Sequence, residues 1–265
     1  MSLSAEAINQ ATLMLERLRL DGGPLEALPD TCRPRDIDEA YAIQGALNKR
    51  LGDAGLGPVV GHKIGCTNAR IQAYMGIHHP ASGAVYQRMV KNQRGEFRFD
   101  TFVKPGVECE LAVRLSTGLP PERAPYDRTS VAAAVDCIMP SFEIVDSRFS
   151  DFRAVGAPTL IADDFFDAGC VLGTPMVNWR SLDLAALNGS VSINGTVVST
   201  GVSGQVMGHP FEALAWLAND FARRGRGLKA GEFVLTGSIA DVIWVSQGDV
   251  AVGEIAGLGS VTARF

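Results

Sequence analysis

In the first part of the chain, hydrophobic residues recur at the spacing of a helix. Between residues 5 and 20 they fall on one face of a helix, and Asp21-Gly22-Gly23-Pro24 ends the run. A second stripe over residues 36–51 is formed by Ala40, Ile43, Leu47 and Leu51, and Gly52 lies just beyond its end. The spacing predicts two helices in a lead-in over residues 1–56. Since no boundary separates this lead-in from the rest of the chain, we expect it to form one structural unit with residues 57–265.

From residue 57 onward the pattern changes to short apolar runs separated by Gly and Pro. Asn194-Gly195, between two alternating runs, is a strong hairpin signal because a type I′ turn needs positive φ at both central residues. Two helices are predicted among these strands, near residues 128–135 and from Pro210 to about Arg224, and a short helical segment precedes His78. Because strands and helices do not alternate, we expect an α+β fold with a β-rich domain. The predicted strands are 58–65, 84–90, 107–115, 137–145, 168–173, 190–193, 196–200, 232–236, 249–255 and 260–265.

Composition narrows the class of protein. The 265 residues are 46% hydrophobic and 20% charged, as in an ordinary globular protein. A net charge of −5, with no long basic run, argues against a nucleic acid or an anionic membrane as partner. No apolar stretch approaches the ~20 residues of a membrane span, and no signal-peptide pattern begins the chain. The five cysteines form no CxxC pair, so we expect reduced packing residues in a cytoplasmic protein. We also expect a homo-oligomer.

The most informative run is Val107-Glu108-Cys109-Glu110-Leu111-Ala112-Val113. Side chains on a strand alternate between faces, so Glu108 and Glu110 share one face with Cα atoms roughly 7 Å apart. Two carboxylates this close repel each other unless solvent, a base or a cation separates them. One interpretation is a solvated face on an edge strand. The other is half of an oxygen-ligand site for a hard divalent cation such as Mg²⁺.

Two further charged residues stand in apolar runs. Glu143, in the run from Cys137 to Asp146, is either at a wet strand edge or buried with a partner, because an unpaired buried carboxylate is costly. Lys63 lies between Gly61 and Gly65, which suggests close backbone approach. It is either a surface lysine or a partly desolvated one, whose pKa would be lowered into a range useful for proton transfer.

Together these segments resemble the 2-oxopent-4-enoate hydratase and 4-oxalocrotonate decarboxylase family of the fumarylacetoacetate hydrolase superfamily. The resemblance runs from the helices near residue 36 to Val261, and its specific part is Glu-x-Glu with a later Glu. Five motifs carry it in order: Gly61-His62-Lys63-Ile64-Gly65, Met75-Gly76-Ile77-His78-His79-Pro80, Val107-Glu108-Cys109-Glu110-Leu111-Ala112, Pro140-Ser141-Phe142-Glu143-Ile144-Val145-Asp146 and Leu235-Thr236-Gly237-Ser238.

The resemblance implies a β-rich fold of mixed sheets that form a distorted barrel or roll. It implies Mg²⁺ or Mn²⁺ on Glu108, Glu110 and Glu143, and a small 2-oxo or 2-hydroxydienoic acid as substrate. The substrate's 1-carboxylate and 2-oxygen would chelate the metal while Lys63 handles a proton. The loop Thr236-Gly237-Ser238 would contact the substrate carboxylate, and we place Asp163 at the substrate as well.

Two positions depart from the family pattern. His78 stands where the family usually has an Asp thought to help place water, and imidazole can do that work near neutral pH. A structural role in the turn before Pro80 is the alternative. The common Ala-Asp-Asn loop reads Ala162-Asp163-Asp164. Neither change affects the residues expected for metal binding and dienolate chemistry, but the two changes leave open which final reaction follows.

The sequence therefore predicts a metal-dependent lyase, with hydration of a 2-hydroxydienoate to a 4-hydroxy-2-oxo acid in aromatic meta-cleavage catabolism as the first choice. Ser238 favours the hydratase, since the decarboxylase branch often has a second glycine there. The alternatives are decarboxylation of the 4-oxalocrotonate type and hydrolytic C–C cleavage of an acylpyruvate. A non-catalytic ligand-binding relative is the rival from another class, and the presence of Lys63 with all three Glu argues against it.

Overall fold

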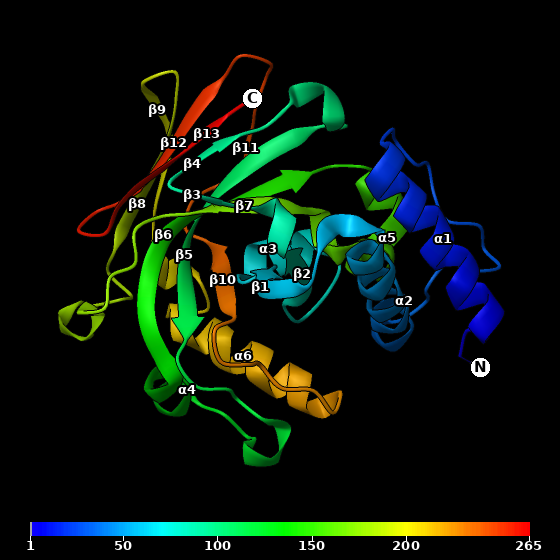
Figure 1. The fold of residues 1–265 in the computed structure, drawn as a ribbon, viewed down its shortest axis with the longest axis horizontal. Coiled ribbons are helices and arrows are strands. Elements are labelled where there is room, and N and C mark those ends of the chain that lie inside the picture. Colours follow the sequence, from blue (N-terminus) through cyan, green and yellow to red (C-terminus); the bar gives the residue numbers. More distant parts are fainter. Residues whose placement is uncertain (1) are drawn as a thin grey trace.

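One mixed sheet of thirteen strands organises the chain in the computed structural model, which describes residues 2–265 (Figure 1). The strand order is β2-β1-β10-β5-β6-β7-β3-β4-β13-β12-β8-β9, with β11 pairing on β5. The pairs β1/β10, β3/β7 and β4/β13 are parallel and the others are antiparallel. The strands are β1 Val59–Gly65, β2 Ala81–Tyr86, β3 Val90–Asn92, β4 Arg94–Glu96, β5 Pro105–Leu115, β6 Val135–Asp146, β7 Asp167–Leu172, β8 Asn188–Ile193, β9 Thr196–Val202, β10 Phe233–Ser238, β11 Ile243–Trp244, β12 Val250–Ile255 and β13 Gly259–Arg264.

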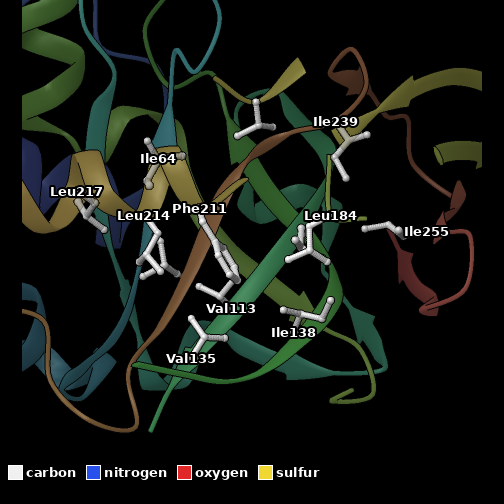
Figure 2. Close-up of a cluster of buried hydrophobic side chains, with 14 of the residues drawn as sticks. Ile64, Val113, Val135, Ile138, Leu184, Phe211, Leu214, Leu217, Ile239 and Ile255 are labelled. Carbon is white, nitrogen blue, oxygen red and sulfur yellow. The ribbon is translucent and has the colours of Figure 1, made fainter. Parts of the chain in front are cut away.

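The sheet folds back on itself around a hydrophobic core. β12 approaches β6 so closely that a Cβ on Gly253 would lie 2.7 Å from the ring of Phe142. Residues of strands that are far apart in the strand order, such as Val113 of β5 and Ile255 of β12, belong to one buried cluster (Figure 2). The amphipathic helix α6 contributes Phe211, Leu214 and Leu217 to the same cluster. This curled mixed sheet is the barrel-like roll that the sequence predicts.

Helices α1, α2 and α5 form a separate layer to one side of the sheet (Figure 1). Their apolar faces share a second buried cluster with β2, which includes Leu15 and Leu47. Ser4 and Asp36 cap α1 and α2 by accepting hydrogen bonds from the first turns. No helix within residues 2–265 is long and apolar enough to cross a membrane. The helices are α1 Ala5–Asp21, α2 Ile37–Leu51, α3 Ala69–Met75, α4 Arg128–Ala134, α5 Phe152–Ala162 and α6 Pro210–Arg223.

Most predicted elements agree with the structure to within a few residues. One prediction was wrong: residues 84–90 are not a single strand, because β2 ends at Tyr86 and a short 3₁₀ turn over Gln87–Met89 precedes β3. The sequence analysis also missed α5, as well as the short strands β4 and β11. All five cysteines are buried and free, in agreement with their predicted role in packing.

Candidate metal centre and its pocket

Three carboxylates converge at the centre of the sheet. β5 lies between β10 and β6, and the register of β5 with β6 places Glu108 directly opposite Glu143 and Glu110 opposite Ser141. Directly opposed residues share a face, and Glu110 is two positions along the same face. Each of the three glutamates offers an oxygen within 4.8 Å of the others. Glu110 and Glu143 are fully buried, so this is not the solvated edge-strand face that was the alternative.

Lys63 reaches this cluster from β1. Its Nζ lies 2.8 Å from Glu143 Oε1, and the residue is only 2% exposed, so it is not a surface lysine. Burial lowers the pKa of Lys63, but the charges of Glu143 and Glu108 outweigh that effect and the net shift is upward. The lowered pKa of Lys63 that was predicted from desolvation alone was therefore wrong. The two neighbouring carboxylates hold the amine in its protonated form.

The donor set fits a divalent cation. Glu143 Oε2 and Glu110 Oε1 are buried without a hydrogen-bond partner among the described residues, and such atoms are costly unless an ion or water satisfies them. Burial raises the pKa of Glu143 to about 7, and burial together with Glu143 and Glu108 raises the pKa of Glu110 well above its usual value. Three carboxylates beside one ammonium leave two negative charges uncompensated, which a divalent cation would neutralise. Oxygen-only donors suit a hard cation such as Mg²⁺ or Mn²⁺.

A pocket of about 540 Å³ opens from this cluster toward solvent. Its inner end is formed by Lys63 and Glu108. Its outer part combines aromatic rings with cationic side chains. Two of those cations pack on rings: the Arg153 guanidinium lies 4.8 Å from the Tyr74 centroid, and Lys104 Nζ lies 4.8 Å from that of Trp244. The aromatic residues are Tyr74, Phe152, Phe165, Phe166 and Trp244, and the other cation is Arg70, which pairs with Asp241 at 2.6 Å.

In the loop Thr236-Gly237-Ser238, the first two residues make hydrogen bonds within the protein and the third faces the pocket. Thr236 is buried and its hydroxyl donates to the Leu111 carbonyl at 2.8 Å, while the Gly237 N–H donates to Glu110 Oε2 at 2.7 Å. These contacts hold β10 to β5 and orient one of the three carboxylates. Gly237 has φ +123°, and a Cβ there would lie 2.5 Å from Thr67 Oγ1. Of the three residues, Ser238 is the one that lines the pocket.

Two residues expected at the substrate lie elsewhere in this structure. His78 is exposed in the turn after α3 and does not line the pocket, although Met75 of that helix does. Its water-handling role stays a prediction that this arrangement does not support. Asp163 is 2% exposed and also does not line the pocket. Its carboxylate accepts from Arg148 Nε at 2.8 Å, so the expected contact with substrate is replaced by an ion pair.

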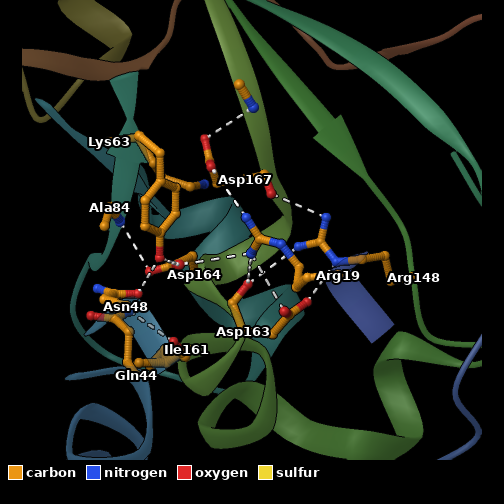
Figure 3. A network of polar contacts seen from close by, with 12 residues as sticks. Arg19, Gln44, Asn48, Lys63, Ala84, Arg148, Ile161, Asp163, Asp164 and Asp167 are labelled. Carbon is orange, nitrogen blue, oxygen red and sulfur yellow. Dashed lines mark hydrogen bonds and ion pairs between the residues drawn. The ribbon is translucent and has the colours of Figure 1, made fainter. Parts of the chain in front are cut away.

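Sequence reasoning missed a buried ionic cluster next to the pocket (Figure 3). It brings Arg19 from α1 and Arg148 from the segment after β6 together with three aspartates between α5 and β7. The concentration of acids in Asp163-Asp164-Phe165-Phe166-Asp167 directly after an apolar segment was the available signal. A buried run of acids needs cations, but only the fold shows which ones. Arg19 lies 144 residues before Asp163 in the chain, and Arg148 lies 15 residues before it.

Comparison with known proteins assigns this architecture to a family. The profile described as "Fumarylacetoacetate (FAA) hydrolase C-terminal" matches residues 77–265, which contain all three carboxylates. The chain belongs to this family of proteins. Solved structures agree: the 4-oxalocrotonate decarboxylase from Pseudomonas putida G7, complexed with magnesium and adipate, superposes with a TM-score of 0.91 at 28% identity, covering 100% of this chain and 99% of that one.

Similarity in sequence extends over nearly the whole chain. The 2-keto-4-pentenoate hydratase of Paraburkholderia xenovorans is 34% identical over 97% of this chain and 94% of its own length. The 4-oxalocrotonate decarboxylase of Pseudomonas putida is 30% identical over 100% of this chain and 98% of its own. Fumarylpyruvate hydrolase from Pseudomonas aeruginosa, at 18% identity and a TM-score of 0.63, shares the fold.

Proposed function

We propose that this protein is a divalent-cation-dependent hydratase, which adds water to a 2-hydroxydienoate or its 2-oxo-alkenoate tautomer to give a 4-hydroxy-2-oxo acid. The observation that carries the proposal is the convergence of Glu108, Glu110 and Glu143 beside the Lys63 amine, at the inner end of a pocket. The similarity to proteins named 2-keto-4-pentenoate hydratase, at 34% identity over 97% of the chain, supports the same choice. Aromatic meta-cleavage catabolism is the setting in which such dienoates arise.

The chain's own residues supply the proton chemistry. Glu108, Glu110 and Glu143 would hold Mg²⁺ or Mn²⁺, which when bound polarises the substrate's 2-oxygen and stabilises negative charge there. Lys63 is the protonated group beside the three carboxylates and it lines the pocket, so it can deliver a proton to C5 of the dienol and take up the proton that the 2-hydroxyl releases as the 2-oxo group forms. Water then adds across C3 and C4, so that its hydroxyl group joins C4 and its remaining proton goes to C3.

A second reaction, decarboxylation of the 4-oxalocrotonate type, is favoured by one feature of the pocket. Arg153 and Lys104 face it without a carboxylate partner among the described residues, because each is held by aromatic rings instead. Cations in that position suit a substrate with a second carboxylate. The P. putida decarboxylase complexed with adipate, a dicarboxylic acid, supports this alternative. Ser238 at the pocket wall favours the hydratase.

Product analysis separates the reactions. The purified protein is incubated with Mg²⁺ or Mn²⁺ and one of three substrates: 2-hydroxypenta-2,4-dienoate, its 6-carboxyl counterpart or an acylpyruvate. Loss of substrate absorbance is monitored, and the products are identified by mass spectrometry. A 4-hydroxy-2-oxo acid supports hydration. Released CO₂ shows decarboxylation, and pyruvate plus a second acid from an acylpyruvate shows hydrolysis. Arg153→Met is the matched variant: it should weaken only the dicarboxylate reaction, while Arg98→Met, outside the pocket, should change neither.

A further inference from the structure

The buried ionic cluster beside the pocket ties the N-terminal helix to the loop between α5 and β7. Arg19 NH1 lies 3.5 Å from Asp163 Oδ1 and 3.7 Å from Asp164 Oδ2, and Arg19 NH2 lies 3.7 Å from Asp167 Oδ2 (Figure 3). Arg148 binds the same loop from the other side, donating to Asp163 Oδ2 at 2.8 Å and to the Asp167 carbonyl at 3.0 Å. The Arg19 side chain is 4% exposed, so these are interior ion pairs whose loss leaves unpaired charge.

The loop that Arg19 holds has a strained backbone. Asp164, Phe165 and Phe166 have φ of +54°, +49° and +70°, a left-handed conformation that is unfavourable for residues with a side chain. Such a conformation persists only where the surroundings impose it. Here the Asp164 carboxylate is fixed at both ends, because its Oδ1 accepts from the Ala84 N–H at 3.0 Å and its Oδ2 faces Arg19.

This loop sets the position of an aromatic ring over the amine of Lys63. The Phe165 ring centroid lies 5.3 Å from Lys63 Nζ, and a Cβ on Gly65 would lie 2.9 Å from the ring, so the ring packs directly on β1. Phe165 and Phe166 both line the pocket. A cation over an aromatic face is attracted to it, and the ring also limits the rotamers open to the lysine.

We propose that Arg19 is a positioning residue for Lys63, acting through the Asp163–Asp167 loop and the ring of Phe165. The inference rests on the proposed function only in naming Lys63 as the proton-transfer group. It assigns a role in the site to helix α1, which lies outside the residues 77–265 that the family profile matches. Helix α1 thereby helps to position a residue of the site, in addition to supporting the sheet.

The test is a double-mutant cycle of Arg19→Met and Phe165→Leu in the Mg²⁺-loaded protein. If Arg19 acts through Phe165, each variant lowers kcat about tenfold or more, because small displacements of a reacting group are costly; in Arg19→Met, which does not alter the pocket lining, KM changes little. The double variant is then no slower than Arg19→Met alone. Losses that multiply, or a wild-type kcat in Arg19→Met, overturn the proposal. Arg50→Met is the matched control, since Arg50 joins α2 to Glu16 of α1 without touching the loop; it keeps wild-type kcat.

A second measurement does not depend on turnover. Reductive methylation of Lys63, with mass-spectrometric readout, reports how firmly the amine is held. We expect methylation to rise about fivefold or more in Arg19→Met and Phe165→Leu and to stay unchanged in Arg50→Met. If Lys63 is methylated to the same extent in the wild type and in all variants, the proposal is overturned even if the substrate assignment is correct. Absence of turnover on every dienoate refutes the proposed function but leaves this readout intact. If Arg19→Met does not fold, Arg19→Lys enters the cycle in its place, with a smaller loss and the same non-additivity expected.

Discussion

Glu110 is the most constrained of the three carboxylates. It is fully buried, its Oε2 accepts from the Gly237 N–H at 2.7 Å, and its Oε1 has no partner among the described residues. Removing its charge while keeping its shape relieves repulsion within the cluster but removes a ligand. We therefore expect the same residue to destabilise the metal-free fold and to be needed for binding the cation.

The substitution Glu110→Gln tests both effects. We expect cation affinity to fall about 100-fold, and the unfolding free energy of the chelator-treated protein to rise by about 1 kcal/mol or more. Calorimetric titration with Mn²⁺ and thermal unfolding in EDTA measure the two quantities. Glu96→Gln, an exposed glutamate on β4, is the control and should leave both unchanged. Unaltered Mn²⁺ affinity in Glu110→Gln would exclude it as a ligand.

Lys63 differs from a structural lysine because its amine lies at the pocket as well as in an ion pair with Glu143. Lys63→Met keeps the aliphatic stem and removes the amine. Turnover should fall about 100-fold or more, because the proton donor is lost, while cation affinity is retained. Steady-state kinetics and Mn²⁺ titration measure these effects, with the exposed Lys91→Met as control. Full activity in Lys63→Met contradicts the assignment.

At the scale of elements, the sequence predicted the helices and strands that have a periodic hydrophobic pattern. It did not predict contacts between segments that lie far apart in the chain. The strand bearing Glu108 and Glu110 can be predicted from alternation, but its pairing with Glu143 depends on the β5/β6 register. Helix α5 was missed because Gly156, at φ +76°, and Pro158 interrupt it, and both residues argue against a helix. Arg19 had no local signal, because its partners lie about half the chain away.

The Asp163–Asp167 loop predicts a pH dependence of stability. Burial raises the pKa of Asp164 from 3.8 to about 7, even though Arg19 opposes the shift; Tyr86, Asp163 and Asp167 also face this carboxylate. A raised pKa means that the folded state binds the proton more tightly than the unfolded state. The stability from this group is therefore complete below pH 3.8 and is lost as the pH rises through about 7.

Asp164→Asn isolates this contribution, since the amide oxygen can still accept from the Ala84 N–H. The variant should match the wild type at low pH and become the more stable of the two, by about 1 kcal/mol or more, as the pH rises from 5.5 to 8.5. Chemical denaturation across that range measures the difference. Asp100→Asn is the control. The hydrogen bond with Arg98 lowers the pKa of Asp100, so any effect of Asp100 on stability changes with pH only below the range from 5.5 to 8.5. A difference that does not change with pH would contradict the prediction.

At the scale of the whole molecule, the helical layer shares one hydrophobic cluster with strand β2 of the sheet, and the curled sheet surrounds another. Leu15 belongs to the cluster of α1, α2 and α5, and Leu111 to that of the curled sheet. Polar contacts add to this link: the Gln44 side chain of α2 donates to the Ser82 carbonyl of β2 at 2.8 Å, and within the helical layer to the Ile161 carbonyl at 2.8 Å. Arg19 adds the buried ion pairs to the loop before β7. Helices without an independent core and with interior polar links should not unfold alone.

We therefore expect residues 1–56 and 57–265 to unfold in one cooperative transition. Leu15→Ala and Leu111→Ala, one in each cluster, should both lower the midpoint of that same transition, with unfolding free energy reduced by about 2–5 kcal/mol because each leaves a cavity. Leu20→Ala, at a residue 46% exposed on α1, is the control and should change stability by no more than about 0.5 kcal/mol. Circular dichroism and tryptophan fluorescence should give coincident curves, since the three tryptophans all lie beyond residue 57. If Leu15→Ala instead separates an early helical transition from a later fluorescence change, the N-terminal helices form an independent unit. Their ties to the site through Arg19 would then be too weak to hold the loop in place.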